Sequence, residues 1–157
     1  MNREILFRGK RIDNDEWVYG LLVYMCEILY IVDSEIYNIL DNDFENLAHA
    51  VKSETIGQYT GLTDKNGKKI FEGDILKIIS SVRGEIIGNT LAFASRERED
   101  CALVLWDHKT GGYKLKVYHK GKYKRIAKFA IGHLIVYEAE VIGNIYDNPE
   151  LLEVEND

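Results

Sequence analysis

The sequence predicts a mainly β protein: an SH3-like β-barrel with an additional N-terminal β-hairpin unit and one or two short helices. Short runs rich in β-branched and aromatic residues recur along the chain, and glycine-containing turns separate them. In addition, residues 54–77 have the pattern strand, turn, apolar step, turn and strand. A Gly-Asp pair that leads into an isoleucine-rich strand, as at Gly73-Asp74, is common in such barrels, so the barrel rests on an analogy of fold.

The segment from Glu54 to Lys77 is the centre of this prediction. Asn66 and Gly67 tolerate positive φ, so we predict a two-residue hairpin turn there. Gly57 interrupts a run of strand-forming residues, which indicates a bulge or a close approach of two backbones. Residues 75–79 are mostly apolar and favour a short strand buried on both faces.

The N-terminal third predicts a hairpin followed by one more strand. Residues 5–7 form the first predicted strand, residues 17–23 its partner and residues 28–32 the third. In residues 33–50, apolar residues at offsets of three and four fit a short helix with Ser34 as N-cap. The sequence Asp-Asn-Asp in the middle of that segment favours a loop, so both alternatives stay open.

The C-terminal half alternates predicted strands with turns. The charged run at residues 95–100 is most simply a solvated turn or mobile loop. Residues 102–106 predict a short apolar strand. In residues 113–119 lysine alternates with apolar residues, which predicts a half-buried strand with a basic outer face. Residues 133–146 predict one or two strands, and Asn148-Pro149 is typical of the start of a short terminal helix.

Length and composition fit a single soluble unit over residues 1–157, with 46% hydrophobic residues and a net charge of -6. A subdivision into residues 1–53, 54–152 and an acidic tail at 153–157 is the alternative. No apolar run of about 18 residues occurs, so we expect no membrane span. The first residues lack the apolar core of a secretory signal. Cys26 and Cys101 cannot build a disulfide framework, and we expect two small buried side chains in a reducing cytoplasm.

The sequence predicts no enzyme, and no catalytic, cofactor-binding or metal-binding residues. No phosphate-binding glycine loop and no serine or cysteine nucleophile motif occurs, and neither cysteine has a partner at a zinc spacing. Carboxylates at turns usually accept hydrogen bonds from backbone N–H groups. We therefore interpret the acidic residues near the central turns as caps, and a paired-carboxylate site is the alternative: Asp64, Glu72 and Asp74. The scattered histidines are expected to be solvated or hydrogen-bonded: His49, His108, His119 and His133.

Charge is unevenly distributed along the chain. Residues 62–130 carry 15 basic and 8 acidic side chains, whereas residues 1–61 and 131–157 are both acidic. Lys109–Lys128 holds eight cations, three tyrosines and no acid, and Phe129 follows directly. Lysines neutralise phosphates and aromatic rings stack on unpaired bases, so this hairpin is a candidate surface for single-stranded nucleic acid. The candidate residues are Lys114, Lys116, Tyr118, Lys120, Lys122, Tyr123, Lys124 and Arg125.

Two simpler interpretations of this hairpin remain. In the first, the lysines form a solvated face that protects a sheet edge from pairing with other strands. Alternatively, it pairs electrostatically with the acidic C-terminal segment from Glu138 to Asp157. The negative charge of the whole chain argues against indiscriminate nucleic-acid binding.

Several short motifs follow one another along the chain, from near the first residue to Leu152. They are Ile5-Leu6-Phe7-Arg8-Gly9-Lys10, Trp17-Val18-Tyr19-Gly20, Thr55 to Leu62, Asp64 to Ile70, Glu72-Gly73-Asp74-Ile75 and Val141 to Leu151. In this order and spacing they resemble the motifs of the YopX family of phage and prophage proteins. The resemblance implies a β-rich fold with an SH3-type barrel and a homo-oligomer. It brings no activity and no site residues, and residues 33–50 and 80–135 match it poorly.

The function expected from these observations is that of a small phage- or prophage-encoded β-barrel protein acting through self-assembly or protein binding. The alternative is a single-stranded nucleic-acid-binding module that uses Lys109–Lys128. We expect a homo-oligomer in the host cytoplasm, with nucleic acid or a phage or host protein as further partners, no cofactor and no membrane.

Overall fold

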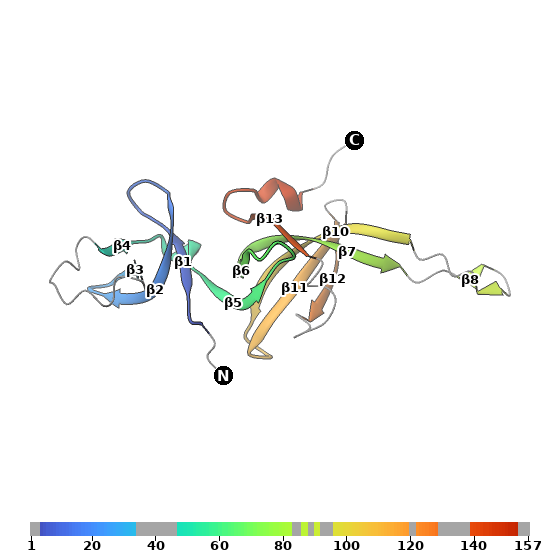
Figure 1. Ribbon diagram of the computed structural model, residues 1–157, viewed down its shortest axis with the longest axis horizontal. Coiled ribbons are helices and arrows are strands. Elements are labelled where there is room, and N and C mark those ends of the chain that lie inside the picture. Colours follow the sequence, from blue (N-terminus) through green and yellow to red (C-terminus); the bar gives the residue numbers. More distant parts are fainter. Residues whose placement is uncertain are drawn as a thin grey trace. The chain divides into compact units, whose positions relative to one another are not determined.

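The computed structural model describes residues 4–33, 47–82, 86–87, 90–91, 96–119, 122–128 and 139–153 (Figure 1). The chain divides into two compact units. The first comprises Met1–Leu62 and Lys69–Glu72, and the second comprises Thr63–Lys68 and Gly73–Asp157. The boundaries expected after residues 53 and 152 stay predictions, because compactness alone does not show which segment folds on its own.

A six-stranded sheet carries the first unit, in the order β4-β3-β2-β1-β5-β6. Strand β3 begins and ends at the predicted residues, 28 and 32. The first strand lies a few residues later than predicted, because polar Arg8 and Lys10 pair with Tyr19 and Trp17 across the ladder. The strands are β1 (Phe7–Lys10), β2 (Trp17–Met25), β3 (Ile28–Val32), β4 (Ala48–Ala50), β5 (Gly57–Thr63) and β6 (Lys69–Phe71), with a 3-10 turn η1 (Ser53–Thr55) before β5.

Two glycines of this unit lie where backbones come close together. A Cβ on Gly57 would lie 2.5 Å from the carbonyl oxygen of Glu72, which confirms the predicted close approach. A Cβ on Gly20 would lie 1.9 Å from the carbonyl oxygen of Val32 in the paired strand. Leu6, Tyr59 and Phe71 form a small buried cluster beside these contacts, and it anchors β5 and β6 to the N-terminal segment.

The turn between β5 and β6 differs from the predicted two-residue turn. Asp64 N–H donates to the carbonyl of Lys68 at 2.8 Å, and Gly67 N–H donates to the carbonyl of Asp64 at 3.0 Å. Of the two central residues expected to have positive φ, only Gly67 does, at 81°. This geometry matches a three-residue loop in which a tight turn is followed by a left-handed glycine. The prediction was wrong because an Asn-Gly pair fits both loops.

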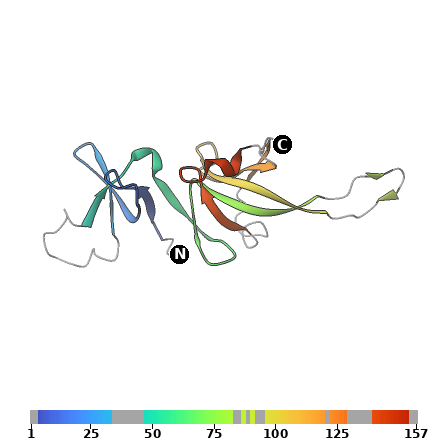
Figure 2. The same ribbon diagram turned by 90° about the horizontal axis from the view of Figure 1, so that it is seen from above.

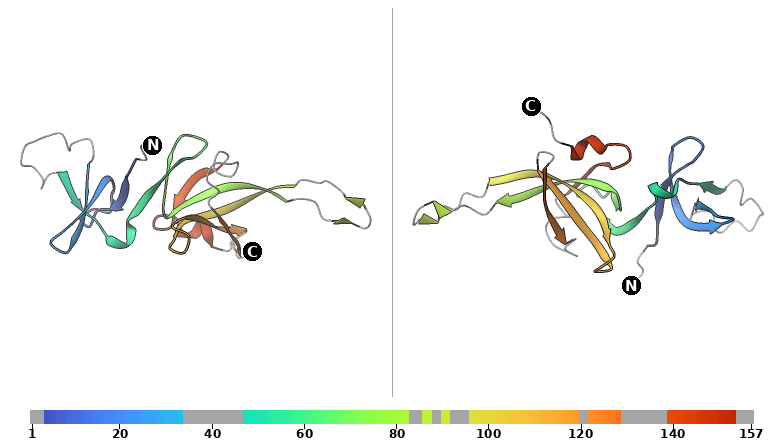
Figure 3. Two further views of the ribbon diagram at one scale, coloured as in Figure 1. Left: turned by 90° about the horizontal axis from the view of Figure 1, so that it is seen from below. Right: turned by 180° about the vertical axis from the view of Figure 1, so that it is seen from behind.

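A five-stranded antiparallel sheet carries the second unit, in the order β12-β11-β10-β7-β13. Figure 2 shows β7 and β10 side by side along their length, and Figure 3 shows β11 beside β12. The strands are β7 (Asp74–Val82), β10 (Arg96–Asp107), β11 (Gly112–His119), β12 (Lys122–Lys128) and β13 (Glu140–Asn144); β8 (Ile86–Ile87) and β9 (Thr90–Leu91) form a separate pair.

The register of this sheet aligns its core residues in rows. Ala102 lies opposite both Leu76 and Val117, and Val104 lies opposite Leu115. All five side chains are essentially inaccessible to solvent. Ile75, on the other face, is also fully buried, so the start of β7 is buried on both faces as predicted. The end of that run is not buried, because Ile79 is 44% exposed.

The charged run near residue 96 is a strand and not the loop that the sequence predicted. Arg96 to Asp100 form the first part of β10 and pair with Val82 to Ile78 of β7. Backbone pairing to a strand that is already anchored does not require apolar side chains on both partners. Asp100 at the end of the run is only 3% exposed, whereas a residue in a solvated loop would be accessible to water.

The predicted mainly β class is confirmed. Neither sheet closes on itself through the pairings of the described strands, so the SH3-like barrel stays a prediction. The terminal helix is present as a 3-10 turn, η2 (Pro149–Leu152), with Asn148 at its N-cap position. Most of the segment expected to form a helix or a loop, residues 34–46, lies outside the described residues, and its described end is strand β4.

Candidate functional site

The predicted basic surface lies on β11 and β12 of the second unit. Leu115 and Val117 are each 1% exposed, so they face the core. Because neighbouring side chains of a strand alternate between faces, Lys114, Lys116 and Tyr118 lie on the outer face, where they are partly exposed. This confirms the predicted half-buried strand with a basic outer face. We call Lys114, Lys116, Tyr118 and the β12 positions opposite them the lysine face.

The register places a second lysine opposite Lys114 on the lysine face. Lys128 of β12 lies opposite Lys114, whereas Ile126 lies opposite Lys116 and Tyr123 opposite Tyr118. Like charges directly opposite each other destabilise a ladder. Lys114 has a counter-charge beside it, because its Nζ lies 3.5 Å from Asp107 Oδ1.

Asp107 stays ionised beside Lys114. The backbone N–H of Lys109 donates to its carboxylate at 3.2 Å. This hydrogen bond, assisted by the charge of Lys114, holds the pKa of Asp107 below its usual value against the opposing effect of desolvation. The carboxylate therefore neutralises one lysine at neutral pH.

Tyr118 brings an aromatic ring next to a cation on the same strand. Lys116 Nζ lies 5.3 Å from the centroid of the Tyr118 ring, a cation–π distance. The ring lies opposite Tyr123 of β12 in the register, beyond a β-bulge at Val117/Tyr118. Aromatic rings interleaved with lysines are the residue types that bind an unpaired base and its phosphate.

The structure places seven of the eight predicted candidates on this one pair of strands. Lys114, Lys116 and Tyr118 belong to β11, and Lys122, Tyr123, Lys124 and Arg125 belong to β12. The eighth, Lys120, lies outside the described residues.

A histidine–aspartate pair on the opposite face was missed by sequence reasoning. His119 Nδ1 lies 2.8 Å from Oδ1 of Asp100, whose side chain is fully buried. The two residues are 19 positions apart, and Asp100 was assigned to a loop. Only the β10–β11 register brings them together, so no local spacing pointed to the pair.

Asp64 is a cap, as predicted for the acidic residues of the central turns. Its Oδ1 accepts hydrogen bonds from the N–H groups of Asn66 and Lys68 at 2.8 and 2.9 Å, and its Oδ2 accepts one from Val141 at 3.0 Å. Burial alone would raise the pKa of this carboxyl, but the three N–H donors outweigh burial and lower the pKa. Among the described residues, no group of three or more His, Cys, Asp and Glu is arranged to hold a metal ion.

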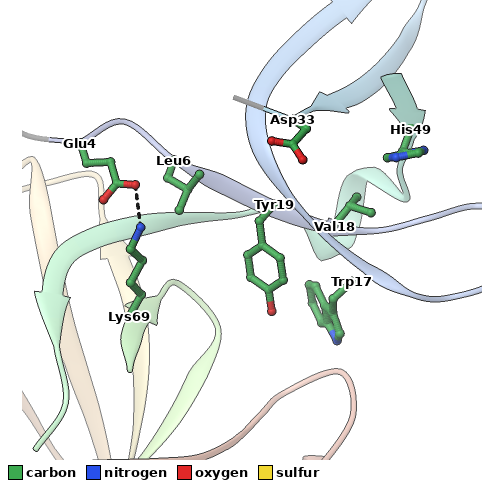
Figure 4. A pocket seen from close by; sticks show the side chains of 8 residues that line it. All are labelled: Glu4, Leu6, Trp17, Val18, Tyr19, Asp33, His49 and Lys69. Carbon is green, nitrogen blue, oxygen red and sulfur yellow. Dashed lines mark hydrogen bonds and ion pairs between the residues drawn. The ribbon is translucent and has the colours of Figure 1, made fainter. Parts of the chain in front are cut away.

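A groove of about 440 Å³ lies on the first unit (Figure 4). Its aromatic wall is Trp17 and Tyr19, and an ion pair at 2.6 Å between Glu4 and Lys69 lies at one end. We call it the aromatic groove; it is lined by Glu4, Leu6, Trp17, Val18, Tyr19, Asp33, His49 and Lys69.

Three cations lie against the aromatic rings of the first unit. Arg8 is 6% exposed, and its Cζ lies 4.8 Å from the Trp17 ring centroid and 5.0 Å from that of Phe71. It also donates a hydrogen bond to the carbonyl of Glu72 at 3.0 Å. Lys10 Nζ lies 5.6 Å from Trp17, and Lys69 Nζ lies 5.3 Å from Tyr59. Sequence reasoning missed this cluster, because its signal is the pairing of Arg-Gly-Lys with Trp-Val-Tyr across two strands.

Comparisons with known proteins place the chain by family and not by activity. A family model described as YopX protein matches residues 6–153. Among solved structures, the chain is similar to protein EF1440 from Enterococcus faecalis, at 20% identity and a TM-score of 0.47, over 97% of this chain and 100% of that one. No curated protein matches the sequence. None of the helices in the described residues has the length and apolar character needed to cross a membrane.

Proposed function

The chain belongs to the YopX protein family, and from this premise we propose that it is a non-catalytic binding protein whose lysine face binds single-stranded nucleic acid. One observation carries the proposal: on the outer face of β11, Lys116 lies over Tyr118, while Lys114 lies opposite Lys128. Phosphates relieve the repulsion between the lysines, and a base stacks on the ring. A duplex, whose bases are already stacked, makes no use of Tyr118.

The test is the anisotropy of a labelled oligothymidylate titrated at several salt concentrations. For single strands the salt slope changes by about 0.7 per phosphate contact, so Lys114→Ala with Lys116→Ala lowers it by roughly 1.4. Lys52→Ala with Lys65→Ala is the matched control, because it removes the same charge from lysines that are ion-paired elsewhere. Equal affinity and slope for both double variants would refute the proposal.

Protein binding or self-assembly is the second candidate function. The tip of the β2–β3 hairpin exposes three large apolar side chains: Tyr24 by 68%, Met25 by 41% and Ile28 by 40%. The turn between them holds Cys26 and Glu27 at positive φ, a conformation that is unusual for residues other than glycine. Clustered apolar residues on a surface are typical of protein contacts.

Size-exclusion chromatography with light scattering tests self-assembly. A mass that rises with concentration, and falls back for Tyr24→Ser, supports a homo-oligomer formed through this tip. A monomer at every concentration excludes self-assembly and leaves binding to a phage or host protein.

The setting that we propose is a phage or prophage protein in the host cytoplasm, whose strands complete an SH3-like barrel. Its motivation is the resemblance of the ordered motifs from Ile5 to Leu151, together with the missing catalytic motifs of the sequence. An experimental structure that shows open sheets over the whole chain would exclude the barrel.

A further inference from the structure

The aromatic groove of the first unit combines a stacking wall with polar groups at its margin. Trp17 and Tyr19 lie on the same face of β2, since they are two residues apart. Tyr19 is 49% exposed, and its ring makes an edge contact with Phe71 at 5.6 Å. A buried neighbour thus positions a ring that remains accessible, which lowers the cost of ordering it when a ligand binds.

The cations of this unit give the wall its electrostatic character. Lys10 lies opposite Trp17 in the register, and Arg8 lies opposite Tyr19. Arg8 is held between two rings and by a carbonyl oxygen, so its position is fixed before any ligand arrives. Fixed positive charge beside an aromatic wall favours a planar ring that carries an anionic group.

The volume and the remaining lining select among such ligands. About 440 Å³ lies within the usual range for pockets that hold small organic molecules. Leu6 and Val18 supply apolar surface for a ring. Lys69 can donate hydrogen bonds to a phosphate at one end of the groove. Toward the other end, His49 can donate a hydrogen bond to a base, and Asp33 can accept one from an amino or hydroxyl group (Figure 4).

We propose that the aromatic groove holds one nucleotide, with the base stacked on Tyr19 and the phosphate toward Lys69 at one end of the groove (Figure 4). The ligand class rests on the proposed function, but the groove is a separate site on the first unit. The nucleotide is either one unpaired residue of a strand or a free mononucleotide, and these two sources share the same chemistry.

Trp17 itself reports on the groove. The chain has two tryptophans, so Trp106→Phe leaves Trp17 as the sole emitter. Thymidine monophosphate, oligothymidylate and inorganic phosphate are titrated separately with selective tryptophan excitation. Saturable quenching by the nucleotide or the oligomer, and none by phosphate, is the expected result. Quenching by the oligomer alone assigns the groove to a strand, and quenching by the monophosphate assigns it to free nucleotide as well.

Variants at Tyr19 separate stacking from folding. In the Trp106→Phe background, Tyr19→Ala weakens binding at least about tenfold, whereas Tyr19→Phe keeps the ring and the affinity. Ile12→Ala is the control, because Ile12 is a 57% exposed apolar residue of the first unit that does not line the groove. Circular dichroism checks that each variant is folded.

The groove and the lysine face fail independently. Lys114→Ala with Lys116→Ala leaves quenching by the monophosphate unchanged even if it abolishes binding of the oligomer. Quenching that persists in Tyr19→Ala, or no saturable quenching by any nucleotide, overturns the groove proposal. Loss of oligomer binding through Tyr19→Ala alone, with the lysine double variant unaffected, overturns the proposed function of the lysine face instead.

Discussion

The lysine face and the aromatic groove are built from the same residue types, but they use their cations differently. Behind the aromatic wall of the groove, Arg8 is buried between Trp17 and Phe71 and donates to a backbone carbonyl. On the lysine face, Lys116 lies over one partly exposed ring on an outer strand surface. A buried cation stabilises the fold that surrounds it, whereas an exposed one costs little to keep and is accessible to a ligand. Substitution of Arg8 should therefore lower the stability of the fold, whereas substitution of Lys116 should mainly weaken ligand binding.

The largest effect on the free energy of unfolding is expected when one methyl group is added at Gly20 in the first unit. Gly20→Ala places a Cβ against the backbone oxygen of Val32, which cannot move without distorting the β2–β3 ladder. We expect a loss of about 3 kcal/mol or more in the free energy of unfolding, measured with urea. Gly112→Ala in the second unit is the control, because nothing lies within 4 Å of its Cβ. Similar losses for both would show that the first unit is not the more tightly constrained.

The second-largest effect on stability is expected at the buried cation, Arg8, and it can be compared with that at the exposed cation, Lys116. Arg8→Ala removes contacts to two rings and a hydrogen bond from a buried site, so we expect a loss of about 2–3 kcal/mol. Lys116→Ala removes one partly exposed contact and should cost about 0.5 kcal/mol or less. The measurement is urea unfolding of both variants at the same pH and salt concentration. Equal costs would break the comparison between buried and exposed cations.

An intermediate effect is expected at Asp64 in the second unit. Its folded pKa is lowered, so its carboxylate stabilises the fold above the unfolded pKa of about 3.9, and this stability is lost as the pH falls through the folded value. Asp64→Asn keeps one acceptor oxygen but places an amide against a backbone N–H. We expect a loss of about 1–2 kcal/mol at pH 7. Unfolding at pH 7 and pH 3 should show a smaller difference for the variant than for the parent protein.

The smallest effect is expected at a surface ion pair. Lys65 Nζ and Glu140 Oε2 lie 2.6 Å apart with both side chains well exposed, so Lys65→Ala should cost about 0.5 kcal/mol or less and even less in 1 M salt. Thermal unfolding at low and high salt measures this. A large, salt-sensitive loss would show that exposed charges do contribute to stability here.

Local pattern was enough to predict part of the fold and of the lysine face. The alternation around Leu115 and Val117 predicted both the strand and its basic outer face, because side-chain direction in a strand follows from sequence position alone. The same holds for the β3 strand, and for Gly57, whose missing side chain indicated close backbones.

Register could not be predicted, and most of the missed features depend on it. Asp64 reaches Val141 across 77 positions, and His119 meets Asp100 only after β10 and β11 are aligned. The charged start of β10 was assigned to a loop because its strand conformation is imposed by β7. The cations beside the aromatic wall depend on the alignment of Arg8 and Lys10 with Tyr19 and Trp17, which no local periodicity encodes.

The hairpin formed by β5 and β6 has a practical consequence for dissecting the protein. All of β6 and all of β5 except Thr63 belong to the first unit, whereas Thr63–Lys68, the segment that joins them, belongs to the second. A truncation between Gly57 and Phe71 therefore removes a strand from the first unit or the joining segment from the second unit. Complementary fragments, split outside the hairpin and mixed, are a sounder way to obtain each half than deletion from either end.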